Sequence, residues 1–283
     1  MREYKNLTIF FVSYYSKKNI KKILKNISPK IKILIVDNAN EVGIEKYFKN
    51  FKNVKIINSN YNSGQSGGIN IGFKNIKTKY SLYMDSDVTF KKKIIDEFIF
   101  TAKKVKDFVI LAPKHERSNY ISEFISHKIS KFKNLTLMKI VHGHFLFMDM
   151  KNVRKVGFFD ENFFLYFEET DFCLRAYKKK LKIYVLESIK VKHEGGWSVD
   201  IENKLDIEAN KHWHYMWSKF YFYKKNYSIY HAYKKTIFDL IECIFKFLIF
   251  YFVSPRKKEI YFNKISGLIN SYSGKKSFKR LKI

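Results

Sequence analysis

Cysteine, proline and glycine are scarce in this chain, and a secretory signal is not apparent. Of its 283 residues, 2 are cysteine, 3 are proline and 11 are glycine. Two cysteines, Cys173 and Cys243, give no disulfide framework, and this usage is typical of a reducing compartment. The first apolar run, Leu7 to Val12, is too short for the core of a signal peptide and lacks a small-residue cleavage site. We therefore expect the protein to stay inside the cell.

Acidic residues are also few compared with basic ones. The chain has 55 Lys and Arg residues against 26 Asp and Glu residues, which gives a formal net charge of +29. Such a charge favours a polyanionic partner, and nucleic acid, anionic lipid and a phosphorylated substrate are the candidates. A biased base composition, which enriches Lys, Ile, Asn, Phe and Tyr throughout, accounts for about half of the excess.

Strand and helix patterns alternate in the first third of the chain. Strands are predicted at residues 7–12, 31–36, 54–57 and from Tyr80, and helices at residues 17–26, 41–51 and 67–77. This alternation predicts an α/β fold with a parallel, doubly wound sheet. Farther along, the patterns predict a helix at 91–104, strands at 108–112, 140–148, 183–186 and 189–191, and a variable or mobile loop at 115–133.

Three acidic residues follow strands of this predicted sheet. Asp37 comes after Val36, and Asp85 and Asp87 follow Met84. Ligands of such sheets bind outside the carboxyl ends of the strands, so we expect the three carboxylates to meet there. Asp85 and Asp87 can point to the same side of extended backbone and together bind Mg²⁺ or Mn²⁺ with a sugar-nucleotide diphosphate. The alternative is an ordinary turn or helix cap.

A glycine-rich segment leads into the helix that precedes Tyr80. Residues 62–72 contain four glycines, which permit a close approach of the backbone to polar or anionic ligand atoms at the start of the helix. The spacing is not that of a dinucleotide fingerprint. A tight connection packed against the sheet is the alternative.

An acidic and aromatic segment is more specific. Residues 157–175 bring Glu168, Glu169 and Asp171 to the start of a helix, where one carboxylate can stay ionised as a general base. The alternative is a capping cluster with Arg175 as its ion-pair partner. Downstream, His193 precedes a Gly-Gly turn that would let a loop fold over a ligand, although a lone histidine is usually structural.

Six motifs, in this order, resemble the glycosyltransferases of family 2, in the rhamnosyltransferase-like branch. The resemblance covers about residues 7 to 225, and its motifs are residues 12–15, 36–39, 62–72, 85–87, 157–175 and 193–198. It implies the GT-A fold, a Rossmann-like nucleotide-diphospho-sugar transferase fold, here with a C-terminal helical extension. The family usually has Glu-Asp where this chain has Glu168-Glu169, which shifts some weight to Asp171. Residues 40–43 also depart from the family pattern.

The resemblance implies roles for individual residues. Asp37 would contact the nucleobase or ribose, and Asp85 with Asp87 would be the DXD pair that holds nucleotide and metal. Glu169 takes the place of the catalytic base, with Asp171 as the alternative, and His193 that of an additional metal or diphosphate ligand. The remaining residues expected to bind the nucleotide sugar are Ser13, Tyr15, Asn62, Gly64, Gly68, Asn70 and Ser86.

The C-terminal residues 226–283 are basic and aromatic, and we expect them to follow a glycosyltransferase domain at 1–225. Asp239, Glu242 and Lys246 interrupt the apolar stretch 236–253 at spacings that gather them on one helical face. This favours an amphipathic helix lying on a membrane, with the basic clusters at 256–258 and 275–282 meeting anionic headgroups. The alternative is a helix packed against protein or against a dimer partner.

Together these features predict an inverting, metal-dependent hexosyltransferase of bacterial cell-surface polysaccharide biosynthesis. It would transfer a sugar from a UDP- or dTDP-sugar to a lipid-linked or saccharide acceptor at the cytoplasmic face of the cell membrane. A basic nucleic-acid-binding protein is the rival interpretation. That rival does not explain carboxylates at strand ends, which would repel phosphates, so we expect no nucleic-acid partner. The sequence leaves the sugar, the acceptor and the oligomeric state open.

Overall fold

The computed structural model describes residues 4–115, 134–193 and 204–281, and the structural statements below refer to these residues. The chain forms two compact units. Unit 1 comprises residues 1–63, 67–159 and 172–200, and unit 2 comprises residues 64–66, 160–171 and 201–283. Residues 116–133 of the predicted loop and the Gly-Gly turn after His193 lie outside the described residues.

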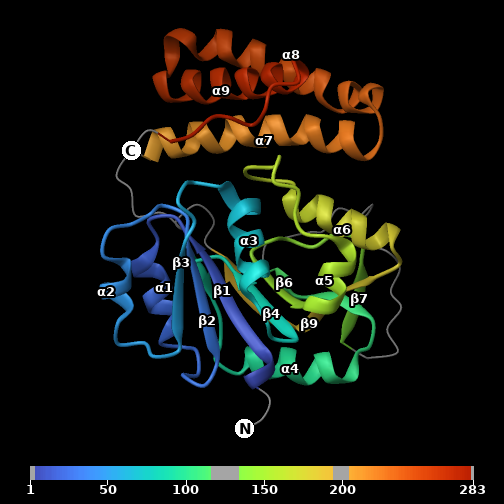
Figure 1. Cartoon of the computed structure of the whole chain (residues 1–283). Helices are drawn as coiled ribbons and strands as arrows, with labels where there is room; N and C mark the ends of the chain where they lie inside the picture. The colour runs from blue at the N-terminus through green and yellow to red at the C-terminus, as the bar shows by residue number, and fades with distance from the viewer. Residues whose placement is uncertain (1–3, 116–133, 194–203, 282–283) are drawn as a thin grey trace. The chain divides into compact units, whose positions relative to one another are not determined.

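Unit 1 contains a nine-stranded sheet in the order β3-β2-β1-β4-β8-β6-β9-β5, with β7 paired to β9 (Figure 1). Its strands are β1 Leu7–Ser13, β2 Lys32–Asp37, β3 Val54–Asn58, β4 Tyr80–Met84, β5 Val88–Thr89, β6 Phe108–His115, β7 Leu135–Met138, β8 Phe145–Asp149 and β9 Lys182–His193. The β3-β2-β1-β4 part is parallel, as predicted. Beyond it the sheet is mixed, because β8 runs antiparallel to both β4 and β6.

Two details of this second half differ from the prediction. The strand predicted at 140–148 begins at Phe145, and β7 precedes it. The two short strands predicted before His193 form one strand, β9, which pairs in parallel with β6 through a register shift after Pro113. Pro113 therefore lies within β6 and does not end it.

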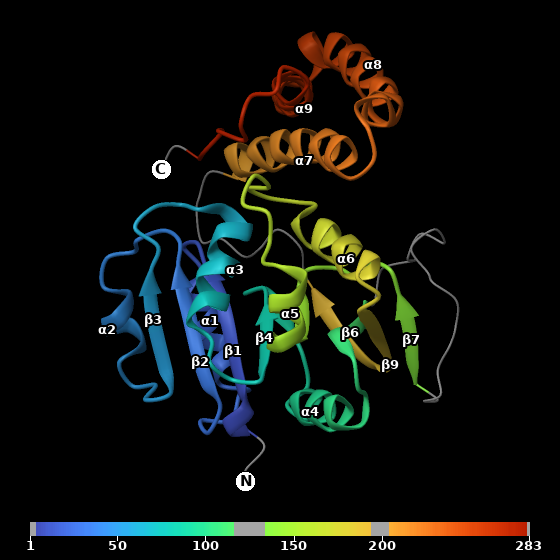
Figure 2. The same cartoon turned by 45° about the vertical axis from the view of Figure 1, so that its right-hand side comes forward.

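Helices cover both faces of the sheet (Figure 2). The short helix η1 is Tyr4–Asn6, and the α-helices are α1 Lys17–Leu24, α2 Ile44–Phe48, α3 Gly64–Asn75, α4 Ile94–Lys104, α5 Met150–Val156 and α6 Glu168–Lys178. Side chains alternate along β1, so that Ile9 packs with α1, α2 and α4, whereas Phe10 packs with α3, α5 and α6. Two apolar cores thus hold the parallel strands, whose carboxyl ends share one edge.

Unit 2 is built on three long helices, α7 Lys204–Asn226, α8 Ile229–Val253 and α9 Pro255–Tyr272 (Figure 1). Ser228 and Ser254 cap α8 and α9, since their side chains accept hydrogen bonds from backbone amides in the first turn. Gly267 of α9 lies against the backbone of Trp213 in α7, so closely that a Cβ atom would overlap the Trp213 carbonyl oxygen. The predicted boundary near residue 225 falls at the turn between α7 and α8, while the contacts group α7 with α8 and α9.

The chain after α9 folds back onto α7. Trp217 donates a hydrogen bond from Nε1 to the carbonyl oxygen of Lys275 at 2.9 Å. Burial lowers the pKa of Lys279, and its amine donates to Asn263. Arg280 stacks over the ring of Phe164 at 3.7 Å. Part of the basic cluster expected to meet lipid headgroups is therefore engaged with protein.

Two further expectations concern cysteine and membrane crossing. Cys173 and Cys243 are both buried and free, so they are not joined to each other by a disulfide. In the part of the chain that the structure describes, no helix combines the length and the apolar character needed to cross a membrane.

Candidate active site

The carboxyl ends of β1, β2 and β4 supply the expected polar edge of unit 1. Ser13 ends β1, where its hydroxyl lies 3.1 Å from that of Ser16. Asp37 ends β2 and is buried, accepting hydrogen bonds from the backbone amides of Ala39 at 3.1 Å and Glu41 at 2.6 Å. Burial raises the pKa of Asp37 above its ordinary value, although the two amide hydrogen bonds oppose this effect. Asp37 thus fixes the loop that follows β2.

Asn38 joins this loop to the glycine-rich segment, a contact that sequence reasoning missed. Its amide nitrogen donates to Oδ1 of Asn62 at 3.2 Å. Its own Oδ1 accepts hydrogen bonds from the backbone amide of Ser63 at 3.0 Å and from the Ser63 hydroxyl at 2.8 Å. Asn62 is therefore brought to the loop that carries Asp37, as expected for two parts of one nucleotide site.

Within unit 1, two predicted positions of the glycine-rich segment have packing contacts. A Cβ atom on Gly68 would lie 2.6 Å from Cγ1 of Val12, so glycine lets α3 approach β1 closely. Asn70 uses both ends of its amide on Phe159: Nδ2 donates to the carbonyl oxygen and Oδ1 accepts from the amide, each at 2.9 Å. These contacts explain the conformation of the segment without a ligand.

Gly64 belongs to unit 2 and has a φ of 72°, which favours glycine. The carbonyl oxygen of Phe164 accepts a hydrogen bond from the amide of Gln65 at 2.8 Å, and a Cβ atom on Gly64 would overlap that oxygen. In unit 1, Tyr15 also has positive φ, 49°, and lies edge-on to Tyr14, while Ser86 is buried between the two aspartates.

Asp85, Asp87 and His193 meet in unit 1. The Nε2 atom of His193, at the end of β9, lies 3.1 Å from Oδ1 of Asp87 and 3.5 Å from Oδ2 of Asp85. Burial would lower the pKa of His193, but the two carboxylates outweigh it and raise that pKa to about 10. The predicted pairing of the aspartates with a histidine 106 positions after Asp87 is thus present in the fold.

Two more side chains complete this cluster. The hydroxyl of Tyr83 donates to Oδ1 of Asp85 at 2.5 Å. The ring of His144 stacks on that of His193, with centroids 4.9 Å apart, and its carbonyl oxygen accepts from the amide of Asp85 at 2.9 Å. Sequence reasoning missed His144, although the run His142-Gly143-His144 directly before an apolar strand is a usable signal.

The donor set of this cluster fits a divalent cation. One ligand atom from each of Asp85, Asp87 and His193 lies within 4.8 Å of the others. Two carboxylate oxygens and an imidazole nitrogen suit Mn²⁺ well, and the oxygens also suit Mg²⁺. The raised pKa of His193 shows that the site concentrates negative charge, which a bound cation would offset in place of the proton.

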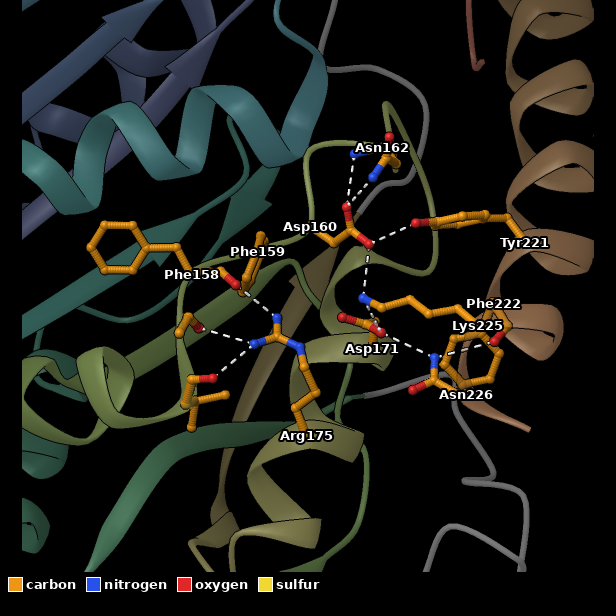
Figure 3. A network of polar contacts seen from close by, with 12 residues as sticks. Phe158, Phe159, Asp160, Asn162, Asp171, Arg175, Tyr221, Phe222, Lys225 and Asn226 are labelled. Atoms are coloured by element: carbon orange, nitrogen blue, oxygen red, sulfur yellow. Dashed lines mark hydrogen bonds and ion pairs between the residues drawn. The ribbon is translucent and has the colours of Figure 1, made fainter. Parts of the chain in front are cut away.

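The predicted acidic cluster at the start of α6 lies in unit 2. There Asp171 is buried and forms an ion pair and a hydrogen bond (Figure 3). Its Oδ1 atom lies 2.8 Å from Nζ of Lys225 and accepts a hydrogen bond from Nδ2 of Asn226 at 3.0 Å. Lys225 also pairs with Asp160 at 2.8 Å, and Tyr221 donates to Asp160 at 3.0 Å. Burial alone would raise the pKa of Asp160, but Lys225 and Asn162 bring it below its ordinary value.

Glu168 is buried and Glu169 half-buried in the same first turn of α6. Before them, Tyr166 and Phe167 both have φ near 68°, which turns the aromatic segment sharply into the helix. Lys225 from α7 is a basic partner of Asp171.

Arg175 belongs to unit 1, and its guanidinium donates hydrogen bonds to three backbone carbonyl oxygens (Figure 3). Its distances are 3.0 Å to Val156, 3.2 Å to Gly157 and 2.7 Å to Phe158. These bonds fix the segment that leads into the aromatic motif. The predicted cluster therefore has a structural part, in which Asp171 pairs with Lys225.

Comparison with known proteins shows the family to which the chain belongs. Residues 8–163, more than half of the chain, match the sequence model described as "Glycosyl transferase family 2". The low-salt glycan biosynthesis hexosyltransferase Agl10 of Haloferax volcanii is 23% identical over 197 residues, which cover 63% of this chain and 64% of that protein. The chain thus matches somewhat less than two thirds of the length of this relative.

Two solved structures share the fold. The mannosyltransferase PcManGT from Pyrobaculum calidifontis, in complex with GDP-Man and Mn²⁺, has a TM-score of 0.61 at 10% identity, over 96% of this chain and 88% of that one. S. aureus TarS 1-349, in complex with UDP-GlcNAc, has a TM-score of 0.52 at 14% identity, over 95% and 92%. These likenesses confirm the predicted GT-A fold. With the family match over residues that include Asp37, Asp85 and Asp87, they lead to one conclusion: this chain belongs to glycosyl transferase family 2.

Proposed function

We propose that the protein is a hexosyltransferase that moves a sugar from a nucleoside-diphosphate sugar to an acceptor during glycan biosynthesis. The cluster of Asp85, Asp87 and His193 carries the proposal, because two carboxylates and an imidazole that could bind a cation come together in a chain of family 2. Support comes from the relative Agl10, described as a glycan biosynthesis hexosyltransferase, and from fold neighbours bound to GDP-Man and UDP-GlcNAc.

On the donor side, Asp85, Asp87 and His193 would hold Mg²⁺ or Mn²⁺, which when bound supplies positive charge to the departing diphosphate. Tyr83 and His144 orient this set through the contacts given above. Asp37, Asn38 and Asn62 shape the loops that would contact the nucleoside. We keep Ser13, Tyr15, Gly64, Gly68, Asn70 and Ser86 as residues that line or shape the donor site.

On the acceptor side, Glu169 takes the proton from the attacking hydroxyl. The acceptor oxygen forms a bond to the anomeric carbon as the bond to the diphosphate oxygen breaks, so a single displacement inverts the configuration. Asp171 is a poorer candidate for the base, because its fully buried carboxylate is paired with Lys225 and bonded to Asn226.

We also propose that α8 lies on an anionic membrane, where a lipid-linked acceptor would be found. Phe238, Phe245 and Phe252 are 77%, 64% and 90% exposed, and their spacing of seven places them on one face of α8. Ile241 and Leu248 lie on the same face and are 57% and 61% exposed. Contiguous exposed apolar surface of this kind is uncommon on monomeric proteins without a binding role.

The basic side chains around the exposed apolar face of α8 favour anionic lipid as its binding partner. Exposed basic side chains border it at both ends of α8: Lys234 and Lys235 near its start, and Lys257 directly after it. Arg256 is exposed there too, although its guanidinium pairs with Glu208 at 2.7 Å. In a chain of net charge +29, such a border complements anionic headgroups. Since no described helix can span a bilayer, we expect binding in the interface with shallow insertion.

The donor-site proposal is tested by calorimetric titration of a nucleoside diphosphate in the presence and absence of Mn²⁺. The wild-type protein should bind UDP, GDP or dTDP more tightly with the cation. Asp87→Asn keeps the shape of the side chain and removes its charge, so it should abolish most of the gain from Mn²⁺ and lower transfer by at least about 10²-fold.

Asp96→Asn is the matched control, because Asp96 is an exposed carboxylate on α4 whose recorded partner is Tyr4. It should bind as the wild type does. A folded Asp87→Asn protein whose affinity still rises with Mn²⁺ to the wild-type extent would refute the assignment of the metal site.

A further inference from the structure

A cavity inside unit 2 has no part in the site described so far. Its volume is about 430 Å³, which lies within the range of small-molecule sites. It opens among α7, α8, α9 and Tyr166, all of which belong to unit 2.

Aromatic rings form part of the wall. Tyr215 of α7 meets Tyr166 at a centroid distance of 5.7 Å in an edge-on arrangement, and Tyr261 contributes from α9. Tyr215 remains 43% exposed, so part of its ring is accessible. Such rings offer apolar faces with polar tips, which suits a ligand that combines C–H surfaces with hydroxyl groups.

Charge in this wall departs from that of the chain as a whole. The lining includes three acidic and three basic residues, Glu208, Asp239, Glu242, Lys211, Lys219 and Lys264. The whole chain, by contrast, has 55 basic and 26 acidic residues. A site for phosphate would show an excess of positive charge. Balanced charges, with carboxylates that accept and ammonium groups that donate hydrogen bonds, suit a neutral polyhydroxylated ligand.

The lining of the cavity also contains groups that can form hydrogen bonds with a ligand. Burial and the charge of Lys264 lower the pKa of His212, another lining residue, so that its ring is neutral and can both donate and accept. Lys219 already pairs with Asp239 at 2.6 Å, which holds two of the charged groups in place before a ligand arrives.

We infer that this cavity binds the saccharide part of the acceptor. The inference rests on the proposed transfer reaction, and it places the acceptor's sugar against Tyr166, Tyr215 and Glu242. Tyr166 lies three residues before Glu169, so their Cα atoms are at most about 11 Å apart. An acceptor that fills the cavity past Tyr166 thus brings its reactive end into the neighbourhood of the candidate base.

The test probes the purified full chain with an array of immobilised oligosaccharides that present hexoses, N-acetylhexosamines and hexuronic acids. Wild type should retain a subset of these glycans. Tyr215→Ala removes a ring face and Glu242→Gln removes a charged acceptor, and each should lower the retained signal at least about tenfold. Both side chains are substantially exposed, so the variants should fold.

Tyr230→Ala and Glu45→Gln are matched controls at exposed positions outside the cavity, and both should retain glycans as wild type does. The inference is overturned if wild type retains no glycan, or if the cavity variants retain the same glycans at the same level. Titration of UDP or GDP with Mn²⁺ is run on the same samples. If wild type binds neither UDP nor GDP in the presence of Mn²⁺, the proposed function is refuted. Failure of the proposed function is thereby distinguished from failure of the inference about the cavity.

Discussion

At the scale of single residues, the two alternative catalytic bases, Glu169 and Asp171, differ in burial. Glu169 and Asp171 are two positions apart in the first turn of α6. Asp171 is fully buried against Lys225 and Asn226, whereas Glu169 is half-buried. A general base must reach the acceptor hydroxyl, and a carboxylate that is fully buried does so less readily than one that is partly accessible.

We therefore expect Glu169→Gln to bind donor normally and to lower kcat by at least about 10²-fold, since the amide keeps the shape but has no basicity. Asp171→Asn should instead lower the free energy of unfolding by about 2 kcal/mol, because it removes the charge of a fully buried carboxylate and leaves Lys225 with Asp160 as its acidic partner. Steady-state kinetics and urea unfolding measure the two effects, with exposed Glu161→Gln as the control. Should Asp171→Asn lose turnover while Glu169→Gln stays active, the two roles must be exchanged.

At the scale of elements, the sequence patterns predicted the strands and helices of the first half of the sheet. The alternation of strands and helices placed Asp37, Asp85 and Asp87 at the ends of parallel strands, which share one edge. The second half of the sheet escaped prediction, because β8 inserts antiparallel between β4 and β6, and nothing in its own residues specifies that pairing. His144 reaches Asp85 only through this insertion.

The same limit applies to the acidic motif on α6. Its carboxylates and their position at a helix start were predicted from residues 157–175. The contact of Asp171 with Lys225 was not, because Lys225 lies 54 positions later on α7, whereas the local spacing indicates only the nearby Arg175. The spacing of residues in the sequence indicates which side chains on the same helix can pair. It does not indicate which side chain on another helix will lie beside them.

On α7, a buried neutral histidine ties the C-terminal segment to the helix. Nε2 of His214 donates to the carbonyl oxygen of Lys279 at 2.9 Å, and Nδ1 accepts from the hydroxyl of Ser277 at 2.9 Å. Burial lowers the pKa of His214 to about 3, with the nearby charges of Arg280 and Lys279 adding to the effect. In the unfolded chain the same ring has a pKa near 6.5, so it binds a proton there first.

Because the unfolded state takes up the proton between pH 6.5 and about 3, this group costs stability as the pH falls through that window. Between about pH 7.5 and pH 5 the loss from His214 should be about 2 kcal/mol. Urea unfolding of wild type and His214→Gln at both pH values measures it, with half-buried His231→Gln on α8 as the control. We expect the glutamine variant to lose less stability on acidification, and an identical loss in both proteins would contradict a buried neutral His214.

At the scale of the whole molecule, two properties meet on α8: a strong positive charge and an exposed apolar face. Removing the C-terminal helices is a poor test of their role, because α8 and α9 bury Met216 and Phe220 of α7 in a shared core. A truncation would expose that core and unfold or aggregate unit 2 for reasons unrelated to lipid. Substitutions confined to the exposed face avoid this problem.

We expect the triple change of Phe238, Phe245 and Phe252 to serine to release the protein from vesicles without unfolding it, since all three side chains are largely exposed. Shallow insertion worth about 1 kcal/mol per ring predicts a loss of affinity of about 10²-fold. Co-sedimentation with phosphatidylcholine vesicles, with and without phosphatidylserine, measures this loss of affinity. The control is Phe100→Ser, because Phe100 on α4 is also 58% exposed.

Wild type should bind the anionic vesicles at low salt. Its binding should weaken at about 1 M salt, where the screening length is about 3 Å. Equal binding of wild type and the triple variant would place the contact elsewhere, and failure of wild type to bind at low salt would mean that α8 meets protein instead of lipid.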